Sequence, residues 1–299
     1  MENKHTIVAC IPAFEEEASI AKVVARARKH VDKVVVVDDG SKDDTGLIAE
    51  AMGAVVLRHE RNLGYGAAIR SCFNSARDLN ADILVTLDAD GQHDPDQIPR
   101  MVEPIRKGLA DVVVGSRFLG GSSKTEAPRY RQAGIRVLTR FTEAASRTEF
   151  TDAQSGFRAY GRKAIGEIVP TEQGMGVSVE ILMKAVEHKL RILEVPVTVE
   201  YKGLDTSTHN PLYHALDVLA SVIKFTSVRH PLVFYGGASA VSLAVSIAFG
   251  AWAIELYSKT GVLVTNITLI SIAFGLVGIL TFFVAVILFT LISVIKEKL

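Results

Sequence analysis

Short runs of apolar residues alternate with longer amphipathic stretches through the first 115 residues of the chain. The apolar runs are rich in Val and Ile, as buried strands are, and the stretches between them have helical spacing. The expected strands cover residues 6–10, 33–37, 54–57, 83–87 and 111–115. The expected helices cover residues 15–30, the segment ending at Met52, residues 67–79 and a segment starting at Pro95. This alternation predicts an α/β fold, a mainly parallel sheet with helices on both faces.

The pattern becomes less regular after Gly120. Residues 120–124 are a Gly- and Ser-rich loop, which is a candidate lid, and a helix is expected to end near residue 147. Further on, a helix is expected at residues 177–188 and a strand at residues 192–201. A polar stretch then closes a first domain that covers residues 1–210.

Apolar residues concentrate in the last 70 positions or so. Residues 211–230 have charged and apolar positions at helical spacing, which favours an amphipathic helix at a membrane interface over a core helix. Residues 231–299 follow as a transmembrane hairpin, with spans expected at about residues 232–255 and 262–295. Basic residues flank both outer ends, whereas the connecting loop holds only one basic residue, Lys259. The positive-inside rule therefore predicts an integral membrane protein with the first domain and both termini in the cytoplasm.

Overall composition narrows the function classes. The formal net charge is zero, which argues against a nucleic-acid partner. The mean hydropathy of +0.26 is high for a soluble protein, and the excess lies in the hairpin. The two cysteines, Cys10 and Cys72, have neither metal-ligand nor redox-motif spacing and exclude a disulfide framework. The N-terminus runs directly into a strand, with no signal peptide expected.

Acidic or turn-forming residues follow three of the expected strands. They are Pro12 to Glu16, Asp38 to Ser41, and Asp88 to Gln92. In a parallel sheet these segments meet at the carboxyl edge of the strands, where ligands bind. Asp88 and Asp90 share a face of an extended backbone, so they could flank one divalent cation, Mg²⁺ or Mn²⁺. A polar turn that merely closes a strand is the alternative for this segment.

Phosphate-binding glycine motifs are missing from the sequence. There is neither a G-x-G-x-x-G nor a G-x-x-x-x-G-K-[ST] segment, and Gly64-Tyr65-Gly66 is too weak to predict a phosphate loop. Gly66 is expected instead to allow close packing at the start of a helix. Any phosphates are then held by a metal and by arginine, with Arg117 placed just after the strand at 111–115. A glycine in the polar loop 152–158 marks a place where the backbone comes close to another group.

Several of these motifs occur together in one known family. Over about residues 5–210 the chain resembles glycosyltransferase family 2 enzymes of the polyprenyl-phosphate type, which include dolichyl-phosphate mannose and glucose synthases. The matching segments are Pro12-Ala13-Phe14-Glu15-Glu16, Asp38-Asp39-Gly40-Ser41, Asp88-Ala89-Asp90-Gly91-Gln92-His93, Gly115-Ser116-Arg117 and Asp152 to Phe157. The resemblance implies a GT-A fold, a Rossmann-like sheet that binds a nucleotide-sugar, and the hairpin fits members with two membrane helices.

The resemblance also implies roles for particular residues. The nucleotide-sugar is expected to contact Pro12, Phe14, Glu16, Val37, Asp39, Asp88, Ala89 and Asp90. The metal is expected to bind Asp88, Asp90 and Gln92, and the main catalytic groups are expected to be Asp90 and Arg117. The acceptor phosphate is expected to contact Arg117, Arg129, Arg131, Ser155, Lys202 and His209. Phe14 and Glu15 depart from the usual Tyr and Asn, and Ser207 to Asn210 departs from the usual S-K-L, which leaves Lys202 and His209 as alternatives.

The implied reaction is transfer of a hexose from a nucleoside diphosphate sugar to polyprenyl or dolichyl phosphate, with inversion. Two rival functions stay open: a family 2 transferase that acts on a lipid-linked saccharide or protein hydroxyl, and a non-catalytic membrane-anchored module that binds nucleotide-sugars. A hydroxyl acceptor would need a positioned base, for which Asp94, Asp152 and His93 are candidates. The sugar, the UDP or GDP carrier, the lipid chain and a homo-oligomeric state are not determined by the sequence.

Overall fold

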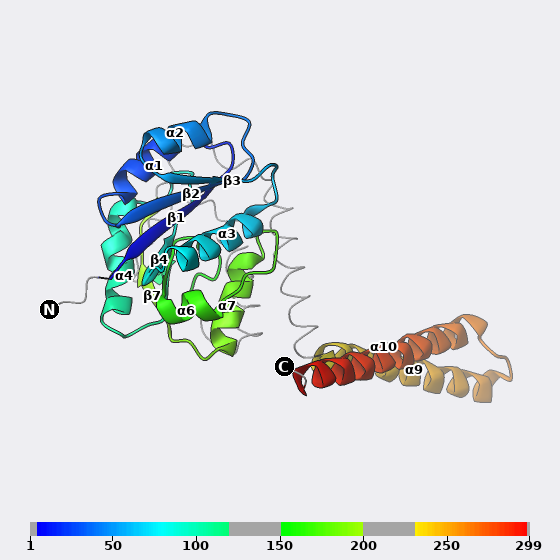
Figure 1. The fold of residues 1–299 in the computed structure, drawn as a ribbon. Helices are drawn as coiled ribbons and strands as arrows, with labels where there is room; N and C mark the ends of the chain where they lie inside the picture. The colour runs from blue at the N-terminus through cyan, green and yellow to red at the C-terminus, as the bar shows by residue number, and fades with distance from the viewer. Residues whose placement is uncertain (1–4, 120–150, 200–230, 298–299) are drawn as a thin grey trace. The chain divides into compact units, whose positions relative to one another are not determined.

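The structure is a computed structural model that describes residues 5–119, 151–199 and 231–297 (Figure 1). The chain divides into two compact units, residues 1–222 and 223–299, and each unit is described by itself. The expected lid at 120–124, the interfacial helix at 211–230 and the polar stretch at 202–210 lie outside the described residues.

A seven-stranded sheet forms the centre of the first unit, in the order β3-β2-β1-β4-β6-β5-β7. All pairings are parallel except those of β6, which runs antiparallel to both neighbours, β4 and β5. The strands are β1 (Ile7–Ala13), β2 (Lys33–Asp38), β3 (Val55–Arg58), β4 (Ile83–Thr86), β5 (Val112–Ser116), β6 (Arg158–Gly161) and β7 (Ile192–Pro196). The expected mainly parallel sheet is thus confirmed.

Helices cover both faces of this sheet, as the alternating pattern predicts. One hydrophobic core joins the sheet to α1 (Ile20–Ala27), α2 (Thr45–Ala51) and α4 (Ile98–Arg106), and η1 (Pro95–Gln97) leads into α4. The other core joins it to α3 (Tyr65–Asp78), α6 (Arg162–Glu167) and α7 (Val177–Glu187). Along β1, Ile7, Ala9 and Ile11 enter the first core, and Val8 and Cys10 enter the second. This two-residue alternation is what a strand buried on both faces requires.

The expected element ends were wrong in three places. Pro12 does not end β1, which continues to Ala13, because β4 pairs with β1 only as far as Cys10 and leaves that side of the strand unpaired. Glu15 does not open α1, which begins at Ile20, since Glu15 has a positive φ of 54° that no helix accommodates. The strand expected at 192–201 ends at Pro196.

Strand β6 and helix α6 were not expected from the sequence at all. All four residues of β6 are buried, and the first of them is the charged Arg158. A charge in a fully buried strand breaks the apolar run by which such strands are recognised. Because Arg158 pairs in register with Thr86 at the end of β4, the loop before β6 lies at the carboxyl edge of β4.

The expected close packing at Gly66 is confirmed. Its amide donates to the carbonyl of Gln173 at 2.7 Å, and a Cβ on Gly66 would lie 2.8 Å from the carbonyl carbon of the same residue. Because the atoms that such a Cβ would meet belong to the backbone, there is no flexible side chain that could move aside. This contact fixes the start of α3 against the segment that precedes α7.

The second unit is a helical hairpin made of α9 (Pro231–Thr260) and α10 (Thr265–Glu297). Both helices are long and apolar enough to cross a membrane, by length and composition. The turn covers only residues 261–264, so the expected loop near 255–261 was wrong: Glu255 and Lys259 are one turn apart in α9 and form an ion pair. Serine hydroxyls join the helices, donating from Ser239 to the Gly278 carbonyl at 2.7 Å and from Ser246 to the Ser271 carbonyl at 2.8 Å.

Substituting Gly66 with Ala is expected to destabilise the protein by about 1–3 kcal/mol, the usual cost of overpacking, because the new methyl group meets fixed backbone. Gly166→Ala in α6 is the matched control, since a Cβ there meets nothing within 4 Å. That control should be neutral or slightly stabilising. Thermal unfolding of both purified full-length variants in detergent measures the difference, and equal melting temperatures would contradict it.

Candidate active site

Four loops come together at the carboxyl edge of the sheet. Those after β1, β2 and β4 belong to neighbouring parallel strands, and the loop 151–157 reaches the same edge because β6 is antiparallel. The first three loops contain the acidic residues that were predicted from the sequence to lie at this edge. The fourth is the polar loop with the expected close approach of a glycine.

Asp88 lies at the centre of this edge. The phenol of Tyr65 donates a hydrogen bond to Oδ1 of Asp88 at 3.0 Å, and Nε2 of His93 lies 4.0 Å from Oδ2. Gly156 packs on the same carboxylate so closely that a Cβ there would lie 2.5 Å from Oδ2. The expectation that a glycine in the 152–158 loop approaches another group is therefore confirmed, and that group is Asp88.

Asp90 is folded back over its own turn. Its Oδ1 accepts a hydrogen bond from the backbone N–H of Gln92 at 2.9 Å, and Gly91 between them has a positive φ of 70°. The side chain of Gln92 is largely buried. The turn thereby holds the Asp90 carboxylate beside the end of β4, one residue beyond the core position of Ala89.

The donor set fits a hard divalent cation that is shared with a substrate. In the described part of the chain no cluster of three or more His, Cys, Asp or Glu side chains forms a complete cage. Mg²⁺ is commonly held by one or two carboxylates together with substrate phosphates and water. Asp88 and Asp90 supply two such carboxylates at the sheet edge where ligands bind.

Glu16 belongs to the same electrostatic neighbourhood. Burial raises the pKa of Glu16, and the negative charges of Asp88 and Asp43 raise it further, against the lowering effect of the Ser19 hydroxyl. That hydroxyl donates to Oε2 of Glu16 at 2.7 Å. Glu16 in the loop after β1 and Asp88 after β4 are therefore close enough to repel each other, and a bound cation would relieve that repulsion.

The carboxylate of Asp39, which follows β2, accepts hydrogen bonds from other residues of the protein on both oxygens. Oδ1 accepts from Nδ1 of His59 at 2.6 Å and from the N–H of Leu63 at 3.0 Å, and Oδ2 accepts from the N–H of Gly64 at 2.9 Å. Nε2 of His59 in turn bonds the Ser71 hydroxyl at 2.9 Å. Asp39 thus ties the loop 59–64 to the end of β2.

The other residues expected at the nucleotide divide into core and edge positions. Val37 is fully buried within the second core, so any contact it makes with a ligand must come from its backbone. Pro12 is buried within β1, and Phe14, just beyond the strand, is half-buried. Only Phe14 among these three presents part of its side chain at the surface.

Arg117 is held by a buried carboxylate. Its Nε and Nη2 donate to the two oxygens of Asp152 at 2.6 and 2.8 Å, and its backbone N–H adds a third bond at 3.1 Å. Asp152 has no exposed surface. Its own N–H and that of Thr151 donate to Glu194 of β7, each at 3.0 Å. This bidentate pair orients the guanidinium plane at the edge of β5.

His93 lies between the Asp88 and Arg117 groups. Burial lowers the pKa of His93, Arg117 lowers it further, and Asp88 and Asp152 act in the opposite direction. The ring packs against Phe157 with centroids 5.3 Å apart. The lowered pKa favours the neutral imidazole, and no described residue hydrogen-bonds its buried Nδ1.

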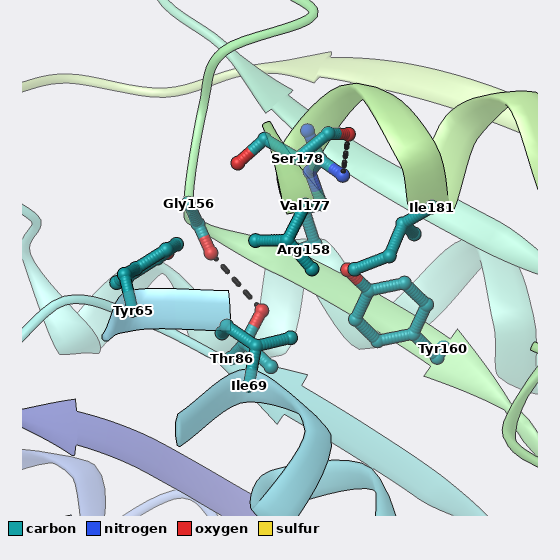
Figure 2. Close-up of a pocket in the computed structure, with 9 residues that line it drawn as sticks. All are labelled: Tyr65, Ile69, Thr86, Gly156, Arg158, Tyr160, Val177, Ser178 and Ile181. Atoms are coloured by element: carbon teal, nitrogen blue, oxygen red, sulfur yellow. Dashed lines mark hydrogen bonds between the residues drawn. The ribbon is translucent and has the colours of Figure 1, made fainter. Parts of the chain in front are cut away.

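A buried arginine, Arg158, hydrogen-bonds the backbone of the loop 151–157. Arg158 donates to the carbonyls of Ser155, Ser178 and Ala153, each at 2.8 Å. Figure 2 shows Arg158 among the residues that line a small pocket between β6, α3 and α7, which also include Tyr65 and Tyr160. The three carbonyls replace a carboxylate as partners of the buried charge and bind the loop to the start of α7.

The expected acceptor residues are only partly described. Arg129, Arg131, Lys202 and His209 lie outside the described residues. Ser155 is buried in the loop beside Gly156, and its hydroxyl has no hydrogen-bond partner within residues 5–119, 151–199 and 231–297. Sequence reasoning missed the Tyr65–Asp88 bond, the Arg117–Asp152 pair and the support by Arg158. The only signals for them were the glycines around Tyr65 and a charge inside the buried F-R-A-Y segment.

Comparison with known proteins identifies the family. The model for "Glycosyl transferase family 2" matches residues 8–169. A UDP-N-acetylglucosamine–dolichyl-phosphate N-acetylglucosaminyltransferase from Methanococcus voltae is 34% identical over 64% of this chain and 84% of its own length. An undecaprenyl-phosphate mannosyltransferase from Micrococcus luteus is 31% identical over 67% of this chain and 86% of its own.

Solved structures agree on the architecture. Glucosyl-3-phosphoglycerate synthase from Mycobacterium tuberculosis, in complex with Mn²⁺, UDP and phosphoglyceric acid, is 26% identical and superimposes with a TM-score of 0.59. The match covers 75% of this chain and 80% of that one. Given a family model that spans more than half of the sequence, and a sheet that carries the acidic edge of a GT-A fold, the chain belongs to glycosyl transferase family 2.

Proposed function

We propose that the protein transfers a sugar from a nucleoside diphosphate sugar to a polyprenyl phosphate at a membrane. The observation that carries this proposal is the carboxyl edge of the sheet, where the carboxylates of Asp88 and Asp90 follow β4 and a guanidinium fixed by Asp152, that of Arg117, follows β5. The relatives named for dolichyl- and undecaprenyl-phosphate support the acceptor class. The two candidate spans support a membrane-bound acceptor, with the catalytic unit and both termini in the cytoplasm.

Asp88 and Asp90, with Gln92, would hold a Mg²⁺ or Mn²⁺ ion against the diphosphate of the donor. When bound, this cation neutralises the charge that grows on the leaving diphosphate. In this proposal the nucleotide is bordered by residues at the ends of β1, β2 and β4: Pro12, Phe14, Glu16, Val37, Asp39 and Ala89. Glu16 would add a further carboxyl group near Asp88, whose negative charge contributes to the raised pKa of Glu16.

The acceptor phosphate would be the nucleophile. A phosphate monoester has a second pKa of about 6, so it is largely ionised at neutral pH and needs no strong base. One of its oxygens forms the bond to the anomeric carbon while the bond from that carbon to the nucleotide phosphate breaks, which inverts the configuration. Arg117 and Ser155, with Arg129, Arg131, Lys202 or His209, would hold the phosphate.

A hydroxyl acceptor fits the described residues less well. It requires a base, and both carboxylates that could serve are already occupied. Asp152 bonds Arg117 through both oxygens, and Asp94 pairs with Arg26 at 2.7 Å on the surface. His93 remains as a candidate base. Its Nε2 lies 4.0 Å from Oδ2 of Asp88, the carboxylate that is proposed to bind the sugar donor and not the acceptor.

The decisive experiment incubates the purified full-length protein with Mg²⁺ or Mn²⁺, a panel of labelled UDP- and GDP-sugars, and either polyprenyl phosphate or polyprenol. We expect one labelled lipid product that forms only with the phosphate and disappears when the metal is chelated. A product with polyprenol would favour the hydroxyl-acceptor enzyme. Binding of a nucleotide-sugar without any product would favour a non-catalytic module.

Asp90→Ala is expected to reduce transfer at least about a hundredfold, the effect of removing one stabilising group from a transition state. Folding and membrane insertion should be intact because Asp90 lies on a turn at the sheet edge. Asp78→Ala removes an exposed carboxylate at the end of α3 and serves as the matched control. Normal turnover by Asp90→Ala would remove the metal assignment.

Arg117→Ala is expected to raise the acceptor KM and also to lower the free energy of unfolding by about 3–5 kcal/mol, because it strands the buried carboxylate of Asp152. Arg162→Ala is the control, since its partner Asp82 is at the surface and such pairs contribute about 1 kcal/mol or less. Melting temperatures and acceptor kinetics separate the two effects. An unchanged KM and kcat would remove Arg117 from the phosphate site.

A further inference from the structure

The glycines around Tyr65 place its side chain. Gly64 has a φ of 95°, which favours glycine, and a Cβ on it would lie 2.7 Å from the carbonyl oxygen of Gln173. Gly66 donates to that same oxygen at 2.7 Å. Tyr65, as the first residue of α3, is therefore fixed on both sides by backbone. In this structure the Gly-Tyr-Gly segment fixes the position of the Tyr65 side chain.

That side chain reaches the end of β4. The Tyr65 phenol bonds Oδ1 of Asp88 at 3.0 Å. An ionised carboxylate only accepts hydrogen bonds, so the phenol is the donor. Burial raises the pKa of Tyr65 well above its usual value, and the charge of Asp88 raises it further. The phenol therefore keeps its proton throughout the neutral range.

The other oxygen of Asp88 has different surroundings. Gly156 packs against both oxygens, since a Cβ there would lie 2.5 Å from Oδ2 and 2.7 Å from Oδ1. Nε2 of His93 lies 4.0 Å from Oδ2, which is beyond hydrogen-bond distance. The carboxylate is thus hydrogen-bonded by Tyr65 on Oδ1 and closely packed against the glycine backbone. It has little freedom to rotate about its Cβ–Cγ bond.

We propose that Tyr65 is a positioning residue that also sets metal specificity: by engaging Oδ1, it makes Asp88 offer a single oxygen, Oδ2, to the cation. This inference rests on the proposed function, in which Asp88 holds the metal. Mg²⁺ requires near-octahedral ligands, whereas the larger Ca²⁺ accepts both oxygens of one carboxylate. Holding Asp88 to one oxygen therefore favours Mg²⁺ or Mn²⁺ over Ca²⁺.

The chain supplies a matched control in Tyr160. This tyrosine is fully buried, whereas Tyr65 is partly buried, and both line the same pocket (Figure 2). Its hydroxyl interacts with Arg158 and Thr86, and its ring packs on Phe73 with centroids 4.9 Å apart. Losing the Tyr160 hydroxyl perturbs the pocket without removing a partner of Asp88.

The test measures metal binding to the full-length protein in detergent by calorimetry, with UDP saturating and again with GDP. Tyr65→Phe is expected to weaken Mg²⁺ binding about tenfold or more, the usual effect of losing a group that orients a ligand. Ca²⁺ binding should change less, so that the ratio of Ca²⁺ to Mg²⁺ affinity rises severalfold. Tyr160→Phe should leave that ratio within about twofold of the wild-type value.

A second comparison shows whether Tyr65 acts through Asp88. In an Asp88→Ala background, Tyr65→Phe should have no further effect on Mg²⁺ binding. An additional loss there, or an unchanged affinity ratio in Tyr65→Phe alone, overturns the inference and leaves the proposed function standing. A wild-type protein that binds neither Mg²⁺ nor Mn²⁺ with either nucleotide overturns the metal site and this inference together.

Discussion

The contact between the Gly156 backbone and the Asp88 carboxylate constrains the rest of the site. Any side chain at position 156 would overlap the carboxylate, with even a Cβ only 2.5 Å from Oδ2. The same short loop carries Asp152, which holds Arg117 through two bonds. One loop therefore fixes both ends of the proposed reaction, the carboxylate for the donor and the guanidinium for the acceptor. A shift of the loop would move both groups together.

A buried positive charge makes this loop rigid. Burying a charge is costly unless it is paired or hydrogen-bonded, and each of the three nitrogens of Arg158 donates to a backbone carbonyl. Two of the carbonyls belong to the loop, at Ala153 and Ser155, and one to Ser178 in α7. Because these acceptors are backbone carbonyls, Arg158 does not occupy the carboxylates of Asp88 or Asp152.

Much of the fold was predictable because its strands are apolar runs buried on both faces. The five strands expected in the first 115 residues are present, and so is the acidic edge they imply. Strand β6 was not predictable, since Arg158 is charged and its bonding depends on residues 153, 155 and 178. The partners of Asp88 and Arg117 were hidden for the same reason: Tyr65 and Asp152 are 23 and 35 positions away. Local periodicity carries no information about such contacts.

The position of β6 in the sheet has a consequence for how the protein folds. This strand lies between β4 and β5, yet the chain reaches it only after β5 and about 40 further residues have been made. Contacts between distant segments form slowly because closing a long loop costs entropy. A nascent chain that ends at β5 therefore has a gap in the middle of its sheet. The strand that joins β4 to β5 and the loop 151–157 at the candidate active site are therefore added in the same late step.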